Sequence, residues 1–169
     1  MKSIIIVGAG LAGSYMAYAM GKKGYDVQVF EKRPDPRKLN YGSGRSINLV
    51  VSHRGWTALK YAGIEKEIRK IVVPAYGRQI HDLEGNESYF AYNIEGKAIY
   101  SISRSEFNKK LVELAEVLPN VTITFDSICE HVDFKKGTVQ MQQGEQSNTF
   151  SADLIVGADG TGSSVRGAL

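Results

Sequence analysis

The sequence predicts an α/β fold in which a parallel βαβ unit is interrupted by a β-rich insertion. The first observation behind this prediction is the continuous apolar run Ile4–Val7, which suits a parallel strand buried on both faces. A glycine-rich turn, a helical stretch over residues 14–23 and an alternating strand over residues 26–31 follow it. The other two observations are the β-like pattern of residues 75–98 and a buried-strand pattern within residues 153–160. Together they favour a Rossmann-like fold.

Local signals predict the remaining elements. Ser52 can cap a helix over residues 53–61, and a shorter helix is expected over residues 64–70. The other predicted elements are strands over residues 76–81, 87–92, 98–102, 121–125, 128–134 and 138–142, and a helix that begins after Ser103 and ends near Leu118. Residues 1–74 and 99–169 are therefore predicted to be Rossmann-like, with residues 75–98 as the β-rich segment.

Composition argues against several other classes of protein. A formal net charge of +3 without a polybasic block gives no reason to expect nucleic-acid binding. No stretch approaches the roughly 20 apolar residues that span a bilayer. The single cysteine, Cys129, allows no internal disulfide, so a reducing, cytoplasmic location is expected. The three histidines lack metal-ligand spacing, so no metal site is predicted.

The chemical signal of the N-terminal unit is the pattern GxGxxG, formed by Gly8, Gly10 and Gly13 with Leu11 and Ala12 between the last two. It follows a strand and opens a helix, and Glu31 ends the next strand. The first glycine suits the tight turn, the second lets a pyrophosphate approach the backbone, and the third allows close helix packing. The helix N-terminus favours phosphate, and Glu31 can accept hydrogen bonds from a ribose. The alternatives are a glycine turn without a ligand and a solvated strand end at Glu31.

The residues that follow Glu31 do not show which dinucleotide binds, but a distant segment favours a long dinucleotide. Residues 153–166 read as a strand, a sharp turn at Asp159 and Gly160, and the start of a helix. Such a turn suits a second approach of the backbone to a long dinucleotide. Asp159 is equally compatible with a simple role as a turn residue.

With these two motifs the sequence resembles the flavoprotein monooxygenases of the p-hydroxybenzoate hydroxylase type, whose internal Asp-Gly signature matches residues 153–166. Within them it is similar to the kynurenine 3-monooxygenase family, and the segments that carry this likeness are residues 31–37, 44–49, 53–56, 76–81, 99–104 and 108–111. The resemblance runs from residue 4 to about residue 168, and proteins of that family are much longer. It implies that the chain is the N-terminal part of a truncated FAD/NAD(P)-binding domain, with FAD as cofactor and NADPH as co-substrate.

The resemblance also implies roles for individual residues. Arg104 is expected on the flavin side of the cofactor, Arg33 on the ribose or adenine side, and Arg45 near the isoalloxazine edge. Arg78 and Tyr92 match the pair that holds the substrate's α-carboxylate, and an arginine fork is geometrically suited to a carboxylate. Without the resemblance, both would read as surface strand residues.

The implied reaction is hydroxylation of L-kynurenine to 3-hydroxykynurenine with NADPH and oxygen. No catalytic side chain is predicted, because Ser163 and Ser164 lack the surroundings of a nucleophile and the flavin carries the chemistry. Two alternatives stay open: a different flavin reaction on the same scaffold, and a binding module without activity.

Overall fold

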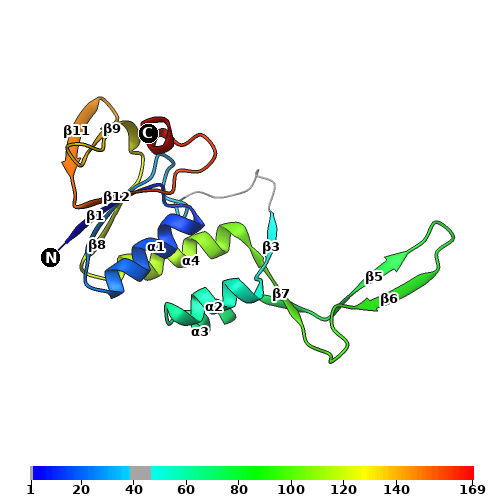
Figure 1. Ribbon diagram of the computed structural model, residues 1–169. Helices are drawn as coiled ribbons and strands as arrows, with labels where there is room; N and C mark the ends of the chain where they lie inside the picture. The colour runs from blue at the N-terminus through cyan, green and yellow to red at the C-terminus, as the bar shows by residue number, and fades with distance from the viewer. Residues whose placement is uncertain (1, 39–46) are drawn as a thin grey trace. The chain divides into compact units, whose positions relative to one another are not determined.

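The computed structural model describes residues 2–38 and 47–169, which form two compact units. Unit 1 is made from residues 1–44 and 108–169, and unit 2 is made from residues 45–107. Figure 1 labels the elements of both, and each unit is described by itself.

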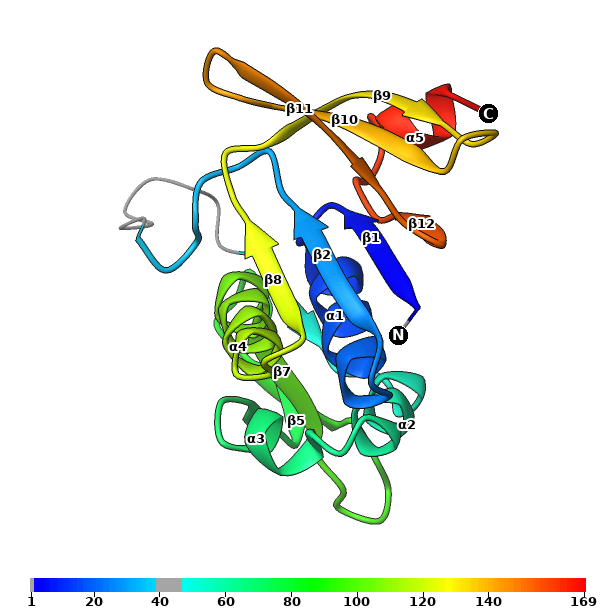
Figure 2. The ribbon, with the colours of Figure 1, turned by 90° about the vertical axis from the view of Figure 1, so that its left-hand side faces the viewer.

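Unit 1 is built on a four-stranded sheet in the order β12-β1-β2-β8. These strands are β12 (Leu154–Gly157), β1 (Ser3–Val7), β2 (Asp26–Phe30) and β8 (Val121–Thr124). All the pairings are parallel, with Ile4 opposite both Leu154 and Val27. Helix α1 (Leu11–Lys22) connects β1 to β2, and in Figure 2 the arrows of β1, β2 and β8 point the same way. The predicted βαβ unit is confirmed.

Both faces of this sheet are covered, which explains why β1 is a continuous apolar run. On one face, Ile4 and Ile6 pack in a cluster with Ala17 of α1 and Ala115 of α4 (Arg104–Glu116). On the other face, Ile5 and Val7 pack in a cluster with the antiparallel sheet β11-β10-β9. That sheet consists of β9 (Ile128–Asp133), β10 (Thr138–Gln143) and β11 (Gln146–Ser151).

Unit 2 contains two small antiparallel sheets and two helices. Its three-stranded sheet, in the order β3-β7-β4, is formed by β3 (Asn48–Val50), β7 (Ile99–Ser103) and β4 (Val73–Ala75). The helices are α2 (His53–Tyr61) and α3 (Glu65–Arg69). The Ser52 hydroxyl accepts a hydrogen bond from the Gly55 N–H at 3.2 Å, so this residue caps α2 as predicted. The second sheet is the hairpin of β5 (Gly77–His81) and β6 (Glu87–Ala91), labelled in Figure 1.

The side chain of Arg69 joins the elements of unit 2. Its guanidinium carbon lies 4.4 Å from the ring centroid of Trp56 and 5.2 Å from that of Tyr100. The two rings meet edge to face, with centroids 5.4 Å apart. Trp56 is half-buried and packs with these side chains in unit 2.

The predicted α/β fold with a Rossmann-like βαβ unit and antiparallel β insertions is confirmed, while several elements differ in detail. Helix α1 begins at Leu11 rather than at Ser14, so the last part of the glycine motif lies inside its first turn. Strands β3, β4 and β11 were not predicted. The limits 75–98 for the segment on the substrate side stay a prediction, and the compact unit in which that segment lies is larger. Among the described residues, no helix has the length and apolarity to cross a membrane.

Candidate functional site

The glycine motif forms the connection between β1 and α1, and two of its glycines are required by packing. Gly8 has φ +101°, and a Cβ there would lie 2.5 Å from the carbonyl oxygen of Ala158. A Cβ on Gly13 would lie 1.8 Å from the carbonyl oxygen of Gly8. Both distances are shorter than a carbon–oxygen contact allows. The turn, the start of α1 and the end of β12 can therefore come together only with glycine at these two positions.

Gly10 is different, because nothing in the described part of the chain requires glycine there. It precedes α1 with φ −70° and ψ −174°, an extended conformation that any residue adopts. A Cβ added to it would meet no atom within 4 Å. The open space lies at the start of α1, where the N–H groups of Leu11, Ala12 and Gly13 have no partner within the helix turn. This arrangement fits the close approach of a pyrophosphate to the backbone.

Glu31 follows β2 and is tied to the glycine turn. One carboxylate oxygen accepts a hydrogen bond from the Ala9 N–H at 2.7 Å, and the other accepts one from the Arg33 N–H at 2.9 Å. Each carboxylate oxygen can accept a second hydrogen bond, so capacity remains for ribose hydroxyls. The fully buried Ser14 adds a bond from its hydroxyl to the Ala9 carbonyl at 2.9 Å. Ser14 was not predicted, and its only signal is a polar residue among the apolar positions of α1.

Asp159 lies two residues beyond the end of β12. Because the last residues of β1 and β12, Val7 and Gly157, are paired, the glycine turn and Asp159 follow at the same end of the sheet. Its carboxylate accepts a hydrogen bond from the Ser163 hydroxyl at 2.6 Å and from the Val165 N–H at 3.3 Å, at the start of α5 (Ser164–Gly167). Burial opposes ionisation of this carboxyl, but these hydrogen bonds outweigh it and hold the pKa of Asp159 below its ordinary value. These bonds give Asp159 a local role in the turn, which the sequence left open, while the N-cap of α5 is Ser163, whose hydroxyl accepts from the Arg166 N–H at 3.0 Å. A cofactor contact of Asp159 and Gly160 stays a prediction.

The hydrogen bonds that the Asp159 carboxylate accepts make the stability of the folded protein depend on pH. Because the folded pKa is lowered, the stabilisation is present above the unfolded pKa and is lost as the pH falls through the folded value. Asp159→Asn, which keeps one acceptor oxygen and loses the other, should therefore lower the free energy of unfolding by about 1 kcal/mol at pH 7, with a smaller difference at pH 3. Urea unfolding at the two pH values measures this, and Ser163→Ala should reduce stability at pH 7 in the same way. Equal losses at both pH values would contradict the role of the ionised carboxylate.

The predicted substrate residues of unit 2 lie on one face of the β5–β6 hairpin. Arg78 pairs with Phe90, and its guanidinium carbon lies 5.6 Å from the centroid of that ring. Just beyond β6, the Tyr92 N–H donates to the Tyr76 carbonyl at 2.9 Å and extends the ladder by one pair. Side chains of residues two apart on a strand share a face, so Arg78 and Tyr92 are diagonal neighbours. Tyr92 is 46% exposed, so the described part of the hairpin presents this face openly.

The other predicted cofactor residues are distributed between the units. Arg33 is exposed in unit 1, two residues after Glu31. Arg104 is the first residue of α4 in unit 2, and its N–H donates to the Ile47 carbonyl at 3.0 Å. Arg45 lies outside the described residues. Across residues 2–38 and 47–169, no group of three metal-ligating side chains comes together.

Comparison with known families identifies the family of the chain. The model of the FAD binding domain family matches residues 1–169, the whole chain. The chain belongs to this family. The long dinucleotide that the two motifs indicated is therefore FAD at the level of the family, while the contacts assigned to single residues stay predictions.

Curated relatives of this FAD-binding chain are kynurenine 3-monooxygenases. The protein from Christiangramia forsetii is 46% identical over 98% of the chain, and that from Dictyostelium discoideum is 42% identical over 99%. The protein from Drosophila melanogaster is 35% identical over 98% of the chain. The chain spans 37%, 36% and 36% of the length of these three relatives.

Solved structures show the same fold. The p-nitrophenol 4-monooxygenase from Pseudomonas putida superposes with a TM-score of 0.77 at 22% identity, over 99% of this chain and 44% of that one. The 2-methyl-3-hydroxypyridine-5-carboxylic acid oxygenase gives a TM-score of 0.76 at 27% identity, over 99% of this chain and 42% of that one. Both likenesses support the fold.

Proposed function

We propose that the chain is the FAD-binding part of an NADPH-using monooxygenase that hydroxylates an aromatic ring, with L-kynurenine as substrate and 3-hydroxykynurenine as product. The observation that carries the proposal is the 46% identity to a kynurenine 3-monooxygenase over 98% of the chain. Because the chain spans 37% of that relative, the activity is proposed for the whole protein and not for this segment alone.

In this proposal the residues of unit 1 bind and orient the cofactor. The N–H groups that open α1 bind the pyrophosphate next to Gly10, and Glu31 accepts hydrogen bonds from the ribose. Arg33 lies close enough in sequence to Glu31 to act at the same adenosine end. FAD, when bound, supplies the transfer of electrons from NADPH to oxygen.

In unit 2, Arg78 and Tyr92 bind the α-carboxylate of the amino-acid substrate. The guanidinium donates a pair of hydrogen bonds to the two carboxylate oxygens, and the tyrosine hydroxyl donates another. These contacts hold one end of the substrate so that its ring keeps a fixed position, and neither side chain transfers a proton. The open face of the hairpin and the diagonal placement of the two residues support this role.

The full-length gene product with bound FAD tests the proposal directly. NADPH oxidation should accelerate when L-kynurenine is added, and the product should be one oxygen heavier by mass spectrometry. A panel of other aromatic acids serves as the control for substrate choice. Stimulation by a different aromatic acid alone would move the proposal to another substrate within the same class of hydroxylases.

A second candidate is a FAD-binding module without activity of its own, and the observation that favours it is the match of the FAD binding domain family to residues 1–169. The 169-residue chain should then take up FAD and show a flavin spectrum without oxidising NADPH in the presence of L-kynurenine. A colourless chain that takes up no FAD would count against this candidate.

A further inference from the structure

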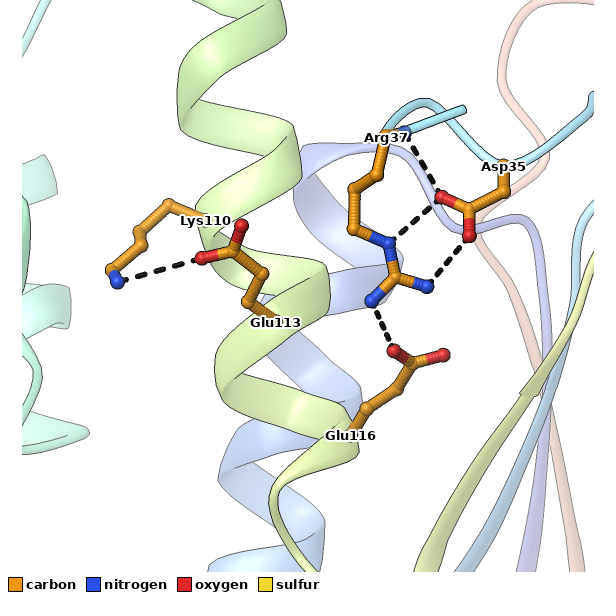
Figure 3. Close-up of polar contacts among 5 residues, drawn as sticks. All are labelled: Asp35, Arg37, Lys110, Glu113 and Glu116. Atoms are coloured by element: carbon orange, nitrogen blue, oxygen red, sulfur yellow. Dashed lines mark hydrogen bonds and ion pairs between the residues drawn. The ribbon is translucent and has the colours of Figure 1, made fainter. Parts of the chain in front are cut away.

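The segment that follows β2 ends in an ionic cluster of Asp35, Arg37 and Glu116, drawn in Figure 3. Arg37 binds Asp35 through two guanidinium nitrogens, Nε to Oδ1 at 2.8 Å and Nη2 to Oδ2 at 2.7 Å. The backbone N–H of Arg37 donates to the same Oδ1 at 2.9 Å. The remaining guanidinium nitrogen binds the carboxylate of Glu116 at the end of α4. One arginine thus links a loop to a helix through charge-assisted hydrogen bonds.

The burial of the cluster separates it from ordinary surface ion pairs. The side chain of Asp35 is 8% exposed, and those of Arg37 and Glu116 are 31% and 30% exposed. The hydrogen bond from Arg37 is the main reason that the pKa of Asp35 is lowered, against an opposing effect of burial. The guanidinium carbon also lies 5.9 Å from the ring centroid of Phe125. Arg37 is therefore fixed on several sides.

Glu116 is placed unfavourably for its own helix. It is the last residue of α4, where the helix dipole favours cations, and the last turn of α4 contains no basic residue. The helix itself gains nothing from a carboxylate at this end. Arg37 supplies the missing positive charge from 79 residues away in sequence. The position of Glu116 is thus explained by the contact with the loop and not by local helix stability.

The cluster holds the far end of the segment that carries two predicted cofactor residues. At its start, the Glu31 N–H donates to the Thr124 carbonyl at 2.9 Å and the Glu31 carbonyl accepts from the Ser127 N–H at 2.9 Å. In its middle, the Arg33 carbonyl accepts from the Asp126 N–H at 3.2 Å. These first anchors are backbone bonds to the end of β8 and to the connection after it, and the cluster adds a side-chain link from the segment to a helix.

We propose that Arg37 and Glu116 are positioning residues for FAD, which hold the segment after β2 so that Glu31 and Arg33 meet the adenosine end of the cofactor. The inference rests on the proposed role of this unit in binding FAD. It assigns a role in the cofactor site to an ion pair that touches no part of the cofactor and acts only through the backbone between residues 31 and 37.

The test uses the apoprotein of the full-length gene product, with the dissociation constants of FAD and ADP measured by fluorescence titration and competition. Arg37→Met and Glu116→Gln should each weaken FAD by about tenfold, and ADP by the same factor because it shares the adenosine end. The matched control is Glu113→Gln, one turn earlier on α4, where the carboxylate lies 3.5 Å from Lys110 Nζ (Figure 3). It should leave both constants unchanged.

A double-mutant cycle separates positioning from general stability. If Arg37 acts through Arg33, the loss of FAD affinity in Arg37→Met with Arg33→Ala should be smaller than the product of the two single losses. Independent losses, or unchanged affinity in both cluster variants, would overturn the inference while FAD binding by the parent protein upholds the proposed function. Absence of FAD binding by the parent protein would overturn the proposed function first. If Arg37→Met does not fold, Glu116→Gln, which keeps the size and the acceptor oxygen, decides the outcome.

Discussion

Gly10→Val is expected to weaken FAD binding by about 100-fold or more, equivalent to about 2.8 kcal/mol, while the protein still folds. The reason is that a side chain at this position affects the fold and the binding of the cofactor separately. The backbone of Gly10 is extended and no atom of residues 2–38 and 47–169 lies within 4 Å of an added Cβ, so this part of the chain accepts a larger residue. The added methyl groups would fill the space through which a pyrophosphate reaches the first N–H groups of α1.

The matched control for this change is Gly13→Ala. Its Cβ would lie 1.8 Å from the carbonyl oxygen of Gly8, so it should prevent normal folding of unit 1 rather than act on the cofactor alone. Thermal unfolding of the apoprotein and fluorescence titration with FAD distinguish the two effects. The loss of the glycine before α1 should reduce stability by no more than about 1 kcal/mol. Unaltered FAD affinity in a folded Gly10→Val protein would show that the cofactor does not approach this turn.

The glycine motif shows what the sequence could and could not predict about the site. Its position between a strand and a helix was enough to predict the turn and the class of ligand. The sequence assigned distinct roles to the three glycines, and the structure gives a packing reason for Gly8 and Gly13, while the approach of a pyrophosphate to Gly10 stays a prediction. Gly8 is required because the backbone just after β12 lies within contact distance of it, and Gly13 is required because α1 lies against the carbonyl of Gly8, whereas no atom of the described residues requires glycine at position 10. Such a distinction depends on β12, a strand whose partner β1 lies at the other end of the chain.

Elements with strong periodicity were predicted well, and those defined by their partners were not. Strand β11 contains the sequence QSNTFS, whose only large apolar residue is Phe150. It becomes a strand because it pairs with β10 and because the Phe150 ring packs on Phe30 with centroids 4.6 Å apart. Strand β4 contains Pro74, which argues against a central strand, and the structure places β4 at the edge of its sheet.

Polar contacts between distant segments were outside the reach of sequence reasoning. The bond between Arg37 and Glu116 joins a loop to the end of a helix, and no pattern in the sequence pairs the two residues. Glu31 was predicted as a ribose ligand, but its hydrogen bond to the Ala9 N–H was not, because the geometry of the turn decides it. The pairing of Arg78 and Tyr92 was implied by resemblance alone. The hairpin register brings both residues to the same face, while their binding of a substrate stays a prediction.

The second large effect is expected at this face. Arg78→Ala should raise the KM for L-kynurenine by about 100-fold, because the carboxylate loses a charge-assisted pair of hydrogen bonds. FAD affinity should not change, because the contact proposed for Arg78 is with the substrate carboxylate and not with the cofactor. Tyr92→Phe removes one hydroxyl and should raise the KM by a smaller factor. Steady-state NADPH oxidation at varied L-kynurenine concentration measures both changes.

Gln79→Ala provides the control, because residue 79 lies on the same strand with its side chain on the opposite face of the hairpin. Arg78→Lys is a sharper probe, since it keeps the positive charge but not the planar fork. A KM that is restored by lysine would indicate attraction by charge alone, whereas a KM close to that of the alanine variant would indicate the bidentate geometry.

The aromatic neighbour of Arg78 provides a further test of the same face. The Phe90 ring centroid lies 5.6 Å from the guanidinium carbon of Arg78. If this contact holds the guanidinium in the orientation that binds the carboxylate in a bidentate way, Phe90→Leu should raise the KM for L-kynurenine. An Arg78→Ala protein with unchanged KM for L-kynurenine would remove this face of the hairpin from the substrate site.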